Sequence, residues 1–174
     1  SNLNHVLTRN QSLLWLAPTV NLTESVTWSV FPALPSGLTI GSSNGTIYGT
    51  PTQNLSQTSF TIRAQTWSTI HTASMSIEVL EITPSFSFSG PPSRSFILNE
   101  PMNLVPTSIG GPVASATVSP TLPSGLYIDS GGAVRGTPTA LSSSTTHTVT
   151  GFNSGGNDTA SITIEVVTAF TYST

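Results

Sequence analysis

One block of five residues occurs twice, unchanged, in this chain of 174 residues. It reads Leu-Pro-Ser-Gly-Leu at residues 34–38 and again at 122–126. Each copy is followed by Gly-Thr-Pro-Thr, at residues 49–52 and 136–139. Self-similarity at a fixed spacing indicates that one structural unit is repeated. We therefore expect two copies of one small domain.

The correspondence continues on both sides of these blocks. Before them, residues of the first copy match those 88 positions later, as Leu16 matches Leu104. After a Gly- and Ser-rich turn in which the second copy is one residue shorter, the offset is 87, and residues 72–79 match residues 159–166. Related β domains commonly differ by such a deletion in a turn, because loops tolerate changes in length.

Apolar and polar residues alternate along much of the sequence, and the period of a helix is nearly absent. Residues 26–31, 60–64 and 75–80 alternate in this way, and so do their counterparts in the second copy. Period-two alternation indicates half-buried strands, and short strands between Gly, Pro and Ser turns are typical of a β-sandwich. We predict an all-β fold with two tandem β-sandwiches, over residues 1–83 and 84–168.

The prolines and glycines of the repeated blocks have structural explanations. Pro35 fixes its φ angle, and Gly37 can adopt the positive φ of a tight corner, so that Leu34 and Leu38 can both reach the core. The proline of Gly-Thr-Pro-Thr cannot donate to a strand ladder and therefore ends a strand. Neither block predicts a catalytic role.

These motifs together resemble a known family. Leu-Pro-x-Gly-Leu, a strand residue two places on (Ile40 and Ile128), a turn glycine, Gly-Thr-Pro-Thr and a closing Ala-Ser-x-x-Ile-Glu-Val strand are similar to the putative Ig, cadherin-like domain. That domain occurs in tandem in large extracellular and surface proteins. The resemblance implies that both sandwiches are Ig-like, or cadherin-like, and that each is a structural or adhesive module without catalytic residues. Cadherin-type calcium sites need clustered acidic ligands, and the expected junction offers only Glu81, so no metal or cofactor is expected.

Composition limits the partners that the chain can have. Only 6% of its residues are charged, against about 25% in an ordinary domain. The net charge is −3, lysine is absent and the four arginines are scattered, which argues against nucleic acid or an anionic membrane as a partner. No apolar run reaches the roughly 18 residues that a membrane span needs. Without cysteine, disulfides and thiolate metal sites are excluded.

The two copies differ at their outer ends. Residues 86–88, Phe-Ser-Phe, should form the first strand of the second domain, and their counterpart in the first domain would precede residue 1. A strand-like tail over 169–174 carries Phe170, Thr171 and Tyr172, which repeat the alternation of Phe-Ser-Phe.

Three explanations of the tail stay open. It begins the next domain of a longer polypeptide, or it completes the sheet of the next subunit by strand addition, giving a head-to-tail polymer. The third is an ordinary tail with alternating residues of common strand composition. Because initiator Met and signal peptide are both missing, the chain is expected to be a processed or excised piece of a longer one.

Five Asn-x-Ser/Thr triplets are candidates for N-glycosylation. Asn44 and Asn157 are favoured because they are expected in exposed turns, and the other three are Asn10, Asn21 and Asn54. In a chain so rich in Ser and Thr, about three such triplets arise by chance. O-linked sugar on Ser and Thr runs, such as residues 142–146, is an alternative.

The histidines do not predict a catalytic or metal site. His147 matches Phe60 at an inward-facing position, so we expect it to be buried in a core. His71 matches Asp158, and both are expected in the loop before the last strand of their domains. Together, His5, His71 and His147 do not assemble a site. With no recurring pair of carboxylates and no distinctive serine, the sequence predicts no enzyme.

The tryptophans offer one route to a binding function. Trp15 and Trp28 lie in apolar or alternating segments and are expected in the core, whereas Trp67 lies in a polar loop. An exposed Trp67 is a possible ligand contact, since aromatic rings stack on sugars.

We therefore predict an extracellular function at the cell surface. The chain is expected to be a structural subunit or repeat unit of a surface filament or stalk, with copies of itself as head-to-tail partners and with attached glycans. Assembly would use β-strand complementation or tandem repetition. The alternative is an adhesive surface module that binds carbohydrate or another ligand.

Overall fold

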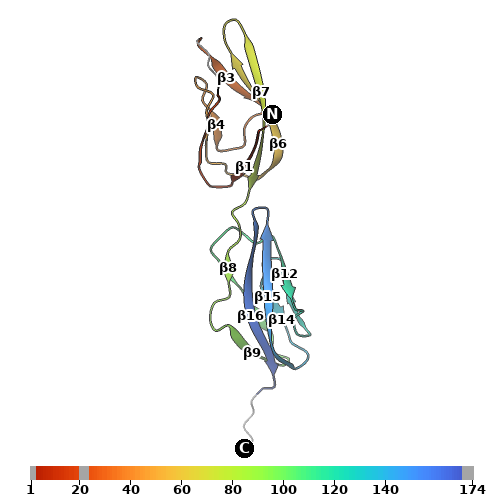
Figure 1. Cartoon of the computed structure of the whole chain (residues 1–174). Helices are drawn as coiled ribbons and strands as arrows, with labels where there is room; N and C mark the ends of the chain where they lie inside the picture. Colours follow the sequence, from red (N-terminus) through yellow and green to blue (C-terminus); the bar gives the residue numbers. More distant parts are fainter. Residues whose placement is uncertain (1–2, 20–23, 170–174) are drawn as a thin grey trace, which may run out of the picture. The chain divides into compact units, whose positions relative to one another are not determined.

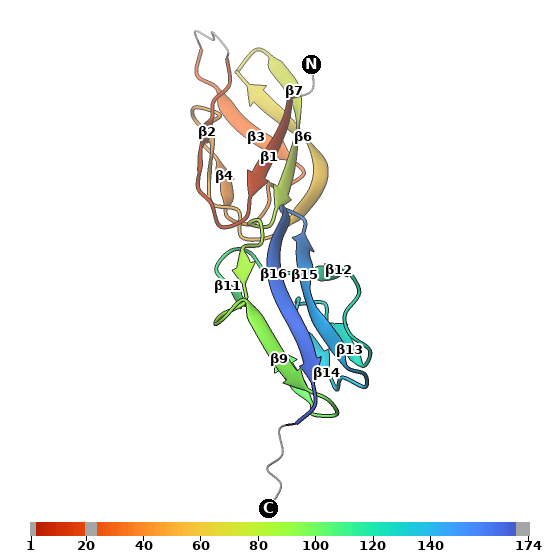
Figure 2. The ribbon, with the colours of Figure 1, turned by 60° about the horizontal axis from the view of Figure 1, so that its bottom comes forward.

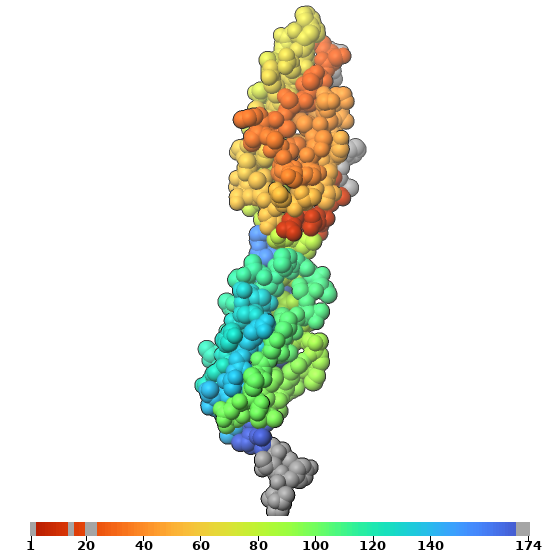
Figure 3. All heavy atoms as spheres, turned by 180° about the vertical axis from the view of Figure 1, so that it is seen from behind, coloured from red at the N-terminus to blue at the C-terminus, as the bar shows by residue number. Residues whose placement is uncertain are grey.

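The structure is a computed structural model that describes residues 3–19 and 24–169, except for the side chains of residues 14 and 15 (Figure 1). It divides into two compact units, which we call unit 1 (Ser1–Glu81) and unit 2 (Ile82–Thr174). Each unit is one continuous part of the chain, red to yellow-green in unit 1 and green to blue in unit 2 (Figure 3). The described residues contain strands and no helix, so none of them belongs to a helix that could cross a membrane.

The strands of unit 1 are β1 (Leu3–Thr8), β2 (Leu13–Leu16), β3 (Thr27–Phe31), β4 (Leu38–Ile40), β5 (Ile47–Gly49), β6 (Leu55–Gln65) and β7 (Ile70–Leu80). Those of unit 2 are β8 (Phe86–Ser87), β9 (Ser93–Ile97), β10 (Met102–Leu104), β11 (Thr107–Ser108), β12 (Ser115–Ser119), β13 (Leu126–Ile128), β14 (Val134–Gly136), β15 (Ser142–Asn153) and β16 (Gly156–Val167). The two sets correspond strand by strand, except for β8 and β11.

Each unit is a sandwich of two sheets. In unit 1 the strand orders are β1-β7-β6-β3 and β2-β5-β4, and in unit 2 they are β9-β16-β15-β12 and β10-β14-β13, with β8 paired to β11. Pairing is antiparallel, except that β1 runs parallel to β7 and β9 runs parallel to β16 (Figure 2). The predicted all-β fold with two Ig-like sandwiches is confirmed.

The core of each unit is formed by apolar side chains of its strands. Unit 1 has one cluster, of Leu38, Ile47, Phe60, Met75, Ile77 and Val79. Unit 2 has two clusters, of Leu104, Val134, Ile162 and Ile164 and of Phe86, Val149 and Ala160. Full burial of one large apolar side chain stabilises a fold by about 1.5–3 kcal/mol, so these clusters account for much of the stability of units this small.

The two repeated blocks of each unit bond to each other. The backbone N–H of Thr50 donates to the carbonyl of Gly37 at 2.9 Å, and that of Thr52 donates to Ser36 at 3.0 Å. Gly37 has φ +91°, as the corner requires, and a Cβ there would lie 1.9 Å from the carbonyl oxygen of Thr50. The blocks recur together because they are the two sides of one contact.

The same contact in unit 2 provides a test. Gly125 has φ +88°, and a Cβ there would lie 2.0 Å from the carbonyl oxygen of Thr137. We expect Gly125→Ala to destabilise unit 2 by at least about 2 kcal/mol, through backbone strain and steric overlap. Calorimetric unfolding measures the loss. Gly131→Ala is the control, because its Cβ would meet only Asp129 Oδ1, at 3.5 Å; equal effects of the two changes would contradict this account.

Candidate functional site

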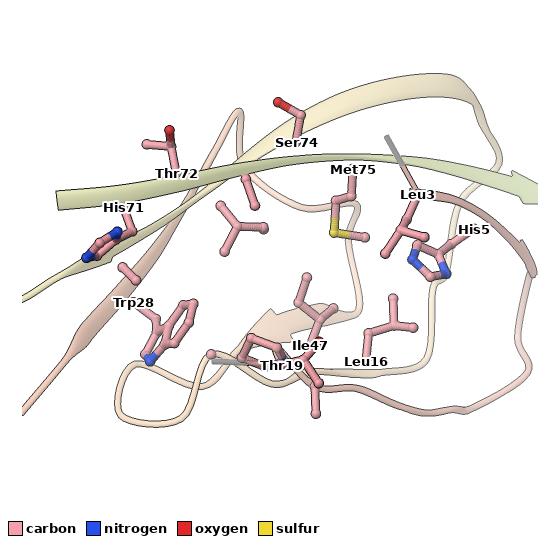
Figure 4. Close-up of a pocket in the computed structure, with 16 residues that line it drawn as sticks. Leu3, His5, Leu16, Thr19, Trp28, Ile47, His71, Thr72, Ser74 and Met75 are labelled. Carbon is pink, nitrogen blue, oxygen red and sulfur yellow. The ribbon is translucent and has the colours of Figure 1, made fainter. Parts of the chain in front are cut away.

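Unit 1 contains an apolar cleft of about 430 Å³. It lies between β7 and the segment that continues β2 to Thr19, and Figure 4 shows its lining residues. Most of these are apolar: Leu3, Leu16, Ala17, Pro18, Trp28, Ile47, Ile62, Ala64, Ala73 and Met75. No carboxylate is among the described residues that line it.

The alternation of β7 decides which of its side chains enter the cleft. His71 and Met75 point into it, whereas Thr72 and Ser74 point away (Figure 4). This follows from the period of two along a strand. Trp28 is close to His71 at one end of the cleft, and it is buried, as predicted, with 8% of its surface exposed.

In unit 2 the equivalent place is filled by β8. Phe86 is 4% exposed and packs with Val149 and Ala160 in one core cluster. By the sequence correspondence, their counterparts in unit 1 are Ile62 and Ala73, both of which line the cleft. The described residues of unit 1 include no strand in the position of β8.

Burial of equivalent residues shows the effect of that strand. Val149 is fully buried and Ala160 is 9% exposed in unit 2, whereas Ile62 is half-buried and Ala73 is exposed in unit 1. The first half of β7, residues 70–74, is exposed throughout. The cleft is therefore the place in unit 1 that corresponds to the one Phe86 fills in unit 2.

Two further interactions hold β8. Ser87 pairs with Thr107 of β11, and the backbone N–H of Phe86 donates to the Asp158 carboxylate at 3.0 Å. The counterparts of Thr107 and Asp158 in unit 1 are Thr19 and His71. His71 and Asp158 were predicted in loops, which is wrong: both lie within strands, because β7 and β16 form long hairpin arms with β6 and β15 that start at residues 70 and 156.

Two histidines line the cleft and the third is buried in unit 2. His5 and His71 lie at opposite ends of the cleft (Figure 4). His147 is 1% exposed, with Nδ1 at 3.0 Å from the carbonyl oxygen of Pro120, so its predicted burial is confirmed. Within the described part of the chain, no three or more His, Asp and Glu side chains are grouped so as to hold a metal ion.

The charged pairs have structural roles. Arg9 lies 2.5 Å from Glu81, the acidic residue considered for the junction, and Glu81 also accepts from Asn54 Nδ2 at 3.0 Å. In unit 2, Arg135 donates to Asp129 at 2.7 Å, and this hydrogen bond holds the pKa of the Asp129 carboxyl below its usual value. None of these four charged residues is among the residues that line the cleft.

The predicted glycosylation sites lie in different settings. Asn10 and Asn44 are exposed in turns, and Asn54 is exposed. Asn157 is exposed too, but it lies in strand β16 and not in a turn as predicted, because the hairpin turns at Ser154 and Gly155. Asn21 lies outside the described residues, as do Phe170, Thr171 and Tyr172.

Trp67 has 87% of its surface exposed, in the turn between β6 and β7. The neighbouring hydroxyls are engaged within this turn, since Thr66 Oγ1 lies 3.0 Å from Thr69 Oγ1 and accepts the Thr69 N–H at 2.9 Å. The exposed position agrees with the prediction. The side chain of Trp15 lies outside the described part of the structure.

The account of Phe86 can be tested by opening a cleft in unit 2. We expect Phe86→Ala to destabilise unit 2 by about 3–5 kcal/mol, since the ring is buried among well-packed neighbours. All three tryptophans belong to unit 1, so their fluorescence serves as an internal control while circular dichroism reports both units. Tyr127→Ala removes a 57% exposed ring and should have little effect. A loss no larger than that of Tyr127→Ala would show that Phe86 is not a core residue.

Comparison with solved structures places both units in the Ig fold. The extracellular domains 3–5 of Drosophila OTK match with a TM-score of 0.53 and 16% identity, over 96% of this chain and 60% of that one. The immunoglobulin domains 1–4 of Sidekick-1 match with a TM-score of 0.54 and 14% identity, over 96% and 48%. The insect immune protein hemolin matches with a TM-score of 0.55 and 10% identity, over 95% and 45%. At such identities the likeness shows the fold alone, and this chain spans between 45% and 60% of the length of these proteins.

No curated protein matches the chain. A family model described as "Putative Ig domain" matches it twice, over residues 4–80 and 81–167. The predicted family with two tandem copies is confirmed, and its cadherin-like aspect stays a prediction. This chain belongs to the "Putative Ig domain" family and carries two tandem copies of that domain.

Proposed function

We propose that this chain is a structural subunit or repeat unit of an extracellular surface filament or stalk whose units follow one another head to tail. One observation carries the proposal. Of two copies of the same sandwich, unit 2 buries its own strand β8, and unit 1 has a cleft in the equivalent place. A sandwich with an unfilled place between its sheets is suited to receive a strand from another domain.

The geometry favours an open array over a closed dimer. The cleft belongs to unit 1, and the strand-like tail comes after the last strand of unit 2 in the sequence. A contact between two different surfaces is heterologous, and repetition of such a contact extends a chain of molecules unless the rotation closes a ring. Tandem repetition within one longer polypeptide would give the same order of domains.

The neighbours support an extracellular and adhesive setting. The OTK fragment consists of extracellular domains, and the domain arrangement of hemolin is described as having implications for homophilic adhesion. By analogy of fold, we place this chain outside the cell. A non-enzymatic role is proposed because the cleft is mainly apolar and its two histidines lie at opposite ends.

Recognition of a carbohydrate or another ligand through Trp67 is the second candidate. Its single support is the 87% exposure of that ring. The hydroxyls of Thr66 and Thr69 already bond each other within the turn, which leaves them less suited to bind a sugar. We therefore rank this function below the array.

If separate subunits form the array, copies of the native chain should form larger assemblies as the protein concentration rises. Light scattering after gel filtration should give a mass that rises with protein concentration, and electron micrographs should show particles of several lengths. The cause is the heterologous contact, which leaves a free end on every assembly. A constant monomer mass together with particles of one length would contradict assembly from separate subunits.

Attached glycans are proposed to solvate the charge-poor surface. N-linked sugar is joined to the amide nitrogen of Asn. This nitrogen of Asn54 donates to Glu81, whereas Asn44 uses its side-chain oxygen to accept the Thr46 N–H. Material from a glycosylating host should therefore carry more sugar at Asn44 than at Asn54, as measured by peptide mass mapping. Thr46→Ala removes the triplet and should abolish the signal, and an intact mass equal to the bare polypeptide would refute glycosylation.

A further inference from the structure

We propose that the cleft of unit 1 binds the tail of a second copy of this chain as an added antiparallel strand, with Phe170 in the place that Phe86 has in unit 2. This inference rests on the proposed head-to-tail array and names its donor and its acceptor. The tail is residues 169–174, of which 170–174 lie outside the described residues.

Unit 2 serves as the template for the donor. In β8, Phe86 is buried and Ser87 is exposed, and Phe88, which follows the strand, packs partly buried against both clusters of unit 2. A segment that alternates aromatic, hydroxyl and aromatic side chains therefore closes this sandwich. Phe170, Thr171 and Tyr172 follow the same order. Because side chains alternate between the faces of a strand, both aromatic rings of the tail would enter the cleft.

The acceptor presents the surface that such a strand covers. Ala73 is exposed, although its counterpart Ala160 is covered by Phe86. Leu3, which also lines the cleft, is 61% exposed. An apolar surface of this kind, beside the extended segment that ends at Thr19, suits β-strand addition, in which backbone bonds supply affinity and pockets for alternate side chains supply specificity.

The fit in unit 1 differs from that in unit 2 at two positions. A Cβ at Gly151 would lie 2.7 Å from the ring of Phe86, and the counterpart of Gly151 is Ala64, which has this methyl group. Trp28 replaces Ala116 and lies against Gly45, whose Cβ would be 2.4 Å from the indole. Because the methyl group of Ala64 would overlap with a ring in the position of Phe86, we expect the bound ring of Phe170 to shift toward the exposed Ala73.

The acceptor is assigned to unit 1 because the equivalent position in unit 2 is occupied. There, Phe86 already fills the position. Each copy then has one acceptor and one donor, which gives a polar chain of copies. The register follows from the template: since Ser87 pairs with Thr107, Thr171 should pair with Thr19.

A disulfide trap tests this register, and the chain has no cysteine of its own to interfere. Two variants of the whole chain are made, Thr19→Cys and Thr171→Cys, mixed and oxidised. Directly paired residues of antiparallel strands have Cα atoms about 4.5–5.5 Å apart, within the range of a disulfide. We expect a cross-linked product of twice the chain mass on a non-reducing gel. Using separate variants ensures that the product joins two copies.

Thr39→Cys is the matched control for the acceptor. Thr39 is an exposed threonine in strand β4 of the same unit, away from the cleft residues. Mixed with Thr171→Cys, it should give at least about tenfold less product. Equal yields with Thr19→Cys and Thr39→Cys would overturn the proposed register. A chain with both Thr19→Cys and Thr171→Cys that forms only an internal disulfide would overturn the assignment to a second copy.

A peptide of residues 168–174 separates this inference from the array itself. The acceptor is the full chain with Phe170→Ala and Tyr172→Ala, so that its own tail does not compete. We expect the peptide to bind, and a peptide with Phe170→Ala to bind at least about tenfold more weakly, since a buried aromatic ring carries much of the binding energy. Ala73→Arg should abolish binding, and Ala33→Arg, at an exposed position outside the cleft, should not.

The outcomes are distinguishable. If the peptide binds and the cross-link forms, but the native chain does not assemble into larger particles, the tail binds the cleft as proposed and the array of separate subunits is refuted. Growth that persists in the Ala73→Arg variant, without cross-linking at Thr19, would uphold the array and overturn this inference. Calorimetry of Ala73→Arg shows whether the variant is folded, and the cross-link at Thr19 gives an independent result if it is not.

Discussion

The structure depends on covering the apolar inner faces of two sheets with a small number of side chains. In a sandwich of this size each large residue is a considerable part of the core. Unit 2 covers the inner faces near β11 with one aromatic ring, Phe86, held by strand pairing and by the Asp158 carboxylate. Unit 1 has the same sheets and the same connections, and its cleft lies at the corresponding place. The difference between the two copies, as far as the structure describes them, is therefore the strand pair β8 and β11 and not a different fold.

Much of the fold could be predicted from the sequence because its signals are local. Alternation places Phe60 and Ile77 inside, and the glycine of each Leu-Pro-Ser-Gly-Leu block has the positive φ that the corner needs. The correspondence between copies also predicts that His147 takes the place of Phe60 in the core. In each of these cases the local sequence pattern, or the same pattern in the other copy, is enough to predict whether the residue is buried or lies in a turn.

The rest depends on contacts between residues that are distant in sequence. That Gly37 bonds Thr50 could not be deduced from either block alone, although both turns were expected. The carboxylate of Asp158 accepts the N–H of Phe86 across 72 residues, and no sequence pattern marks such a pair. The cleft itself was not predicted. The alignment of the two copies gives Phe86 no counterpart among the described residues of unit 1, but it does not predict that Ala73 of β7 is exposed.

The parallel pairing of β1 with β7 has a mechanical consequence. Six residue pairs, from Leu3 with Met75 to Thr8 with Leu80, join the strand by which the chain enters unit 1 to the strand by which it leaves. When the first and last strands of the unit are pulled in opposite directions, the force runs along both strands. It therefore loads all the hydrogen bonds between β1 and β7 at once, in shear, so that they cannot open one after another from one end. The pair β9 and β16 repeats this arrangement in unit 2. We expect both units to resist stretching along the chain better than peeling from the side.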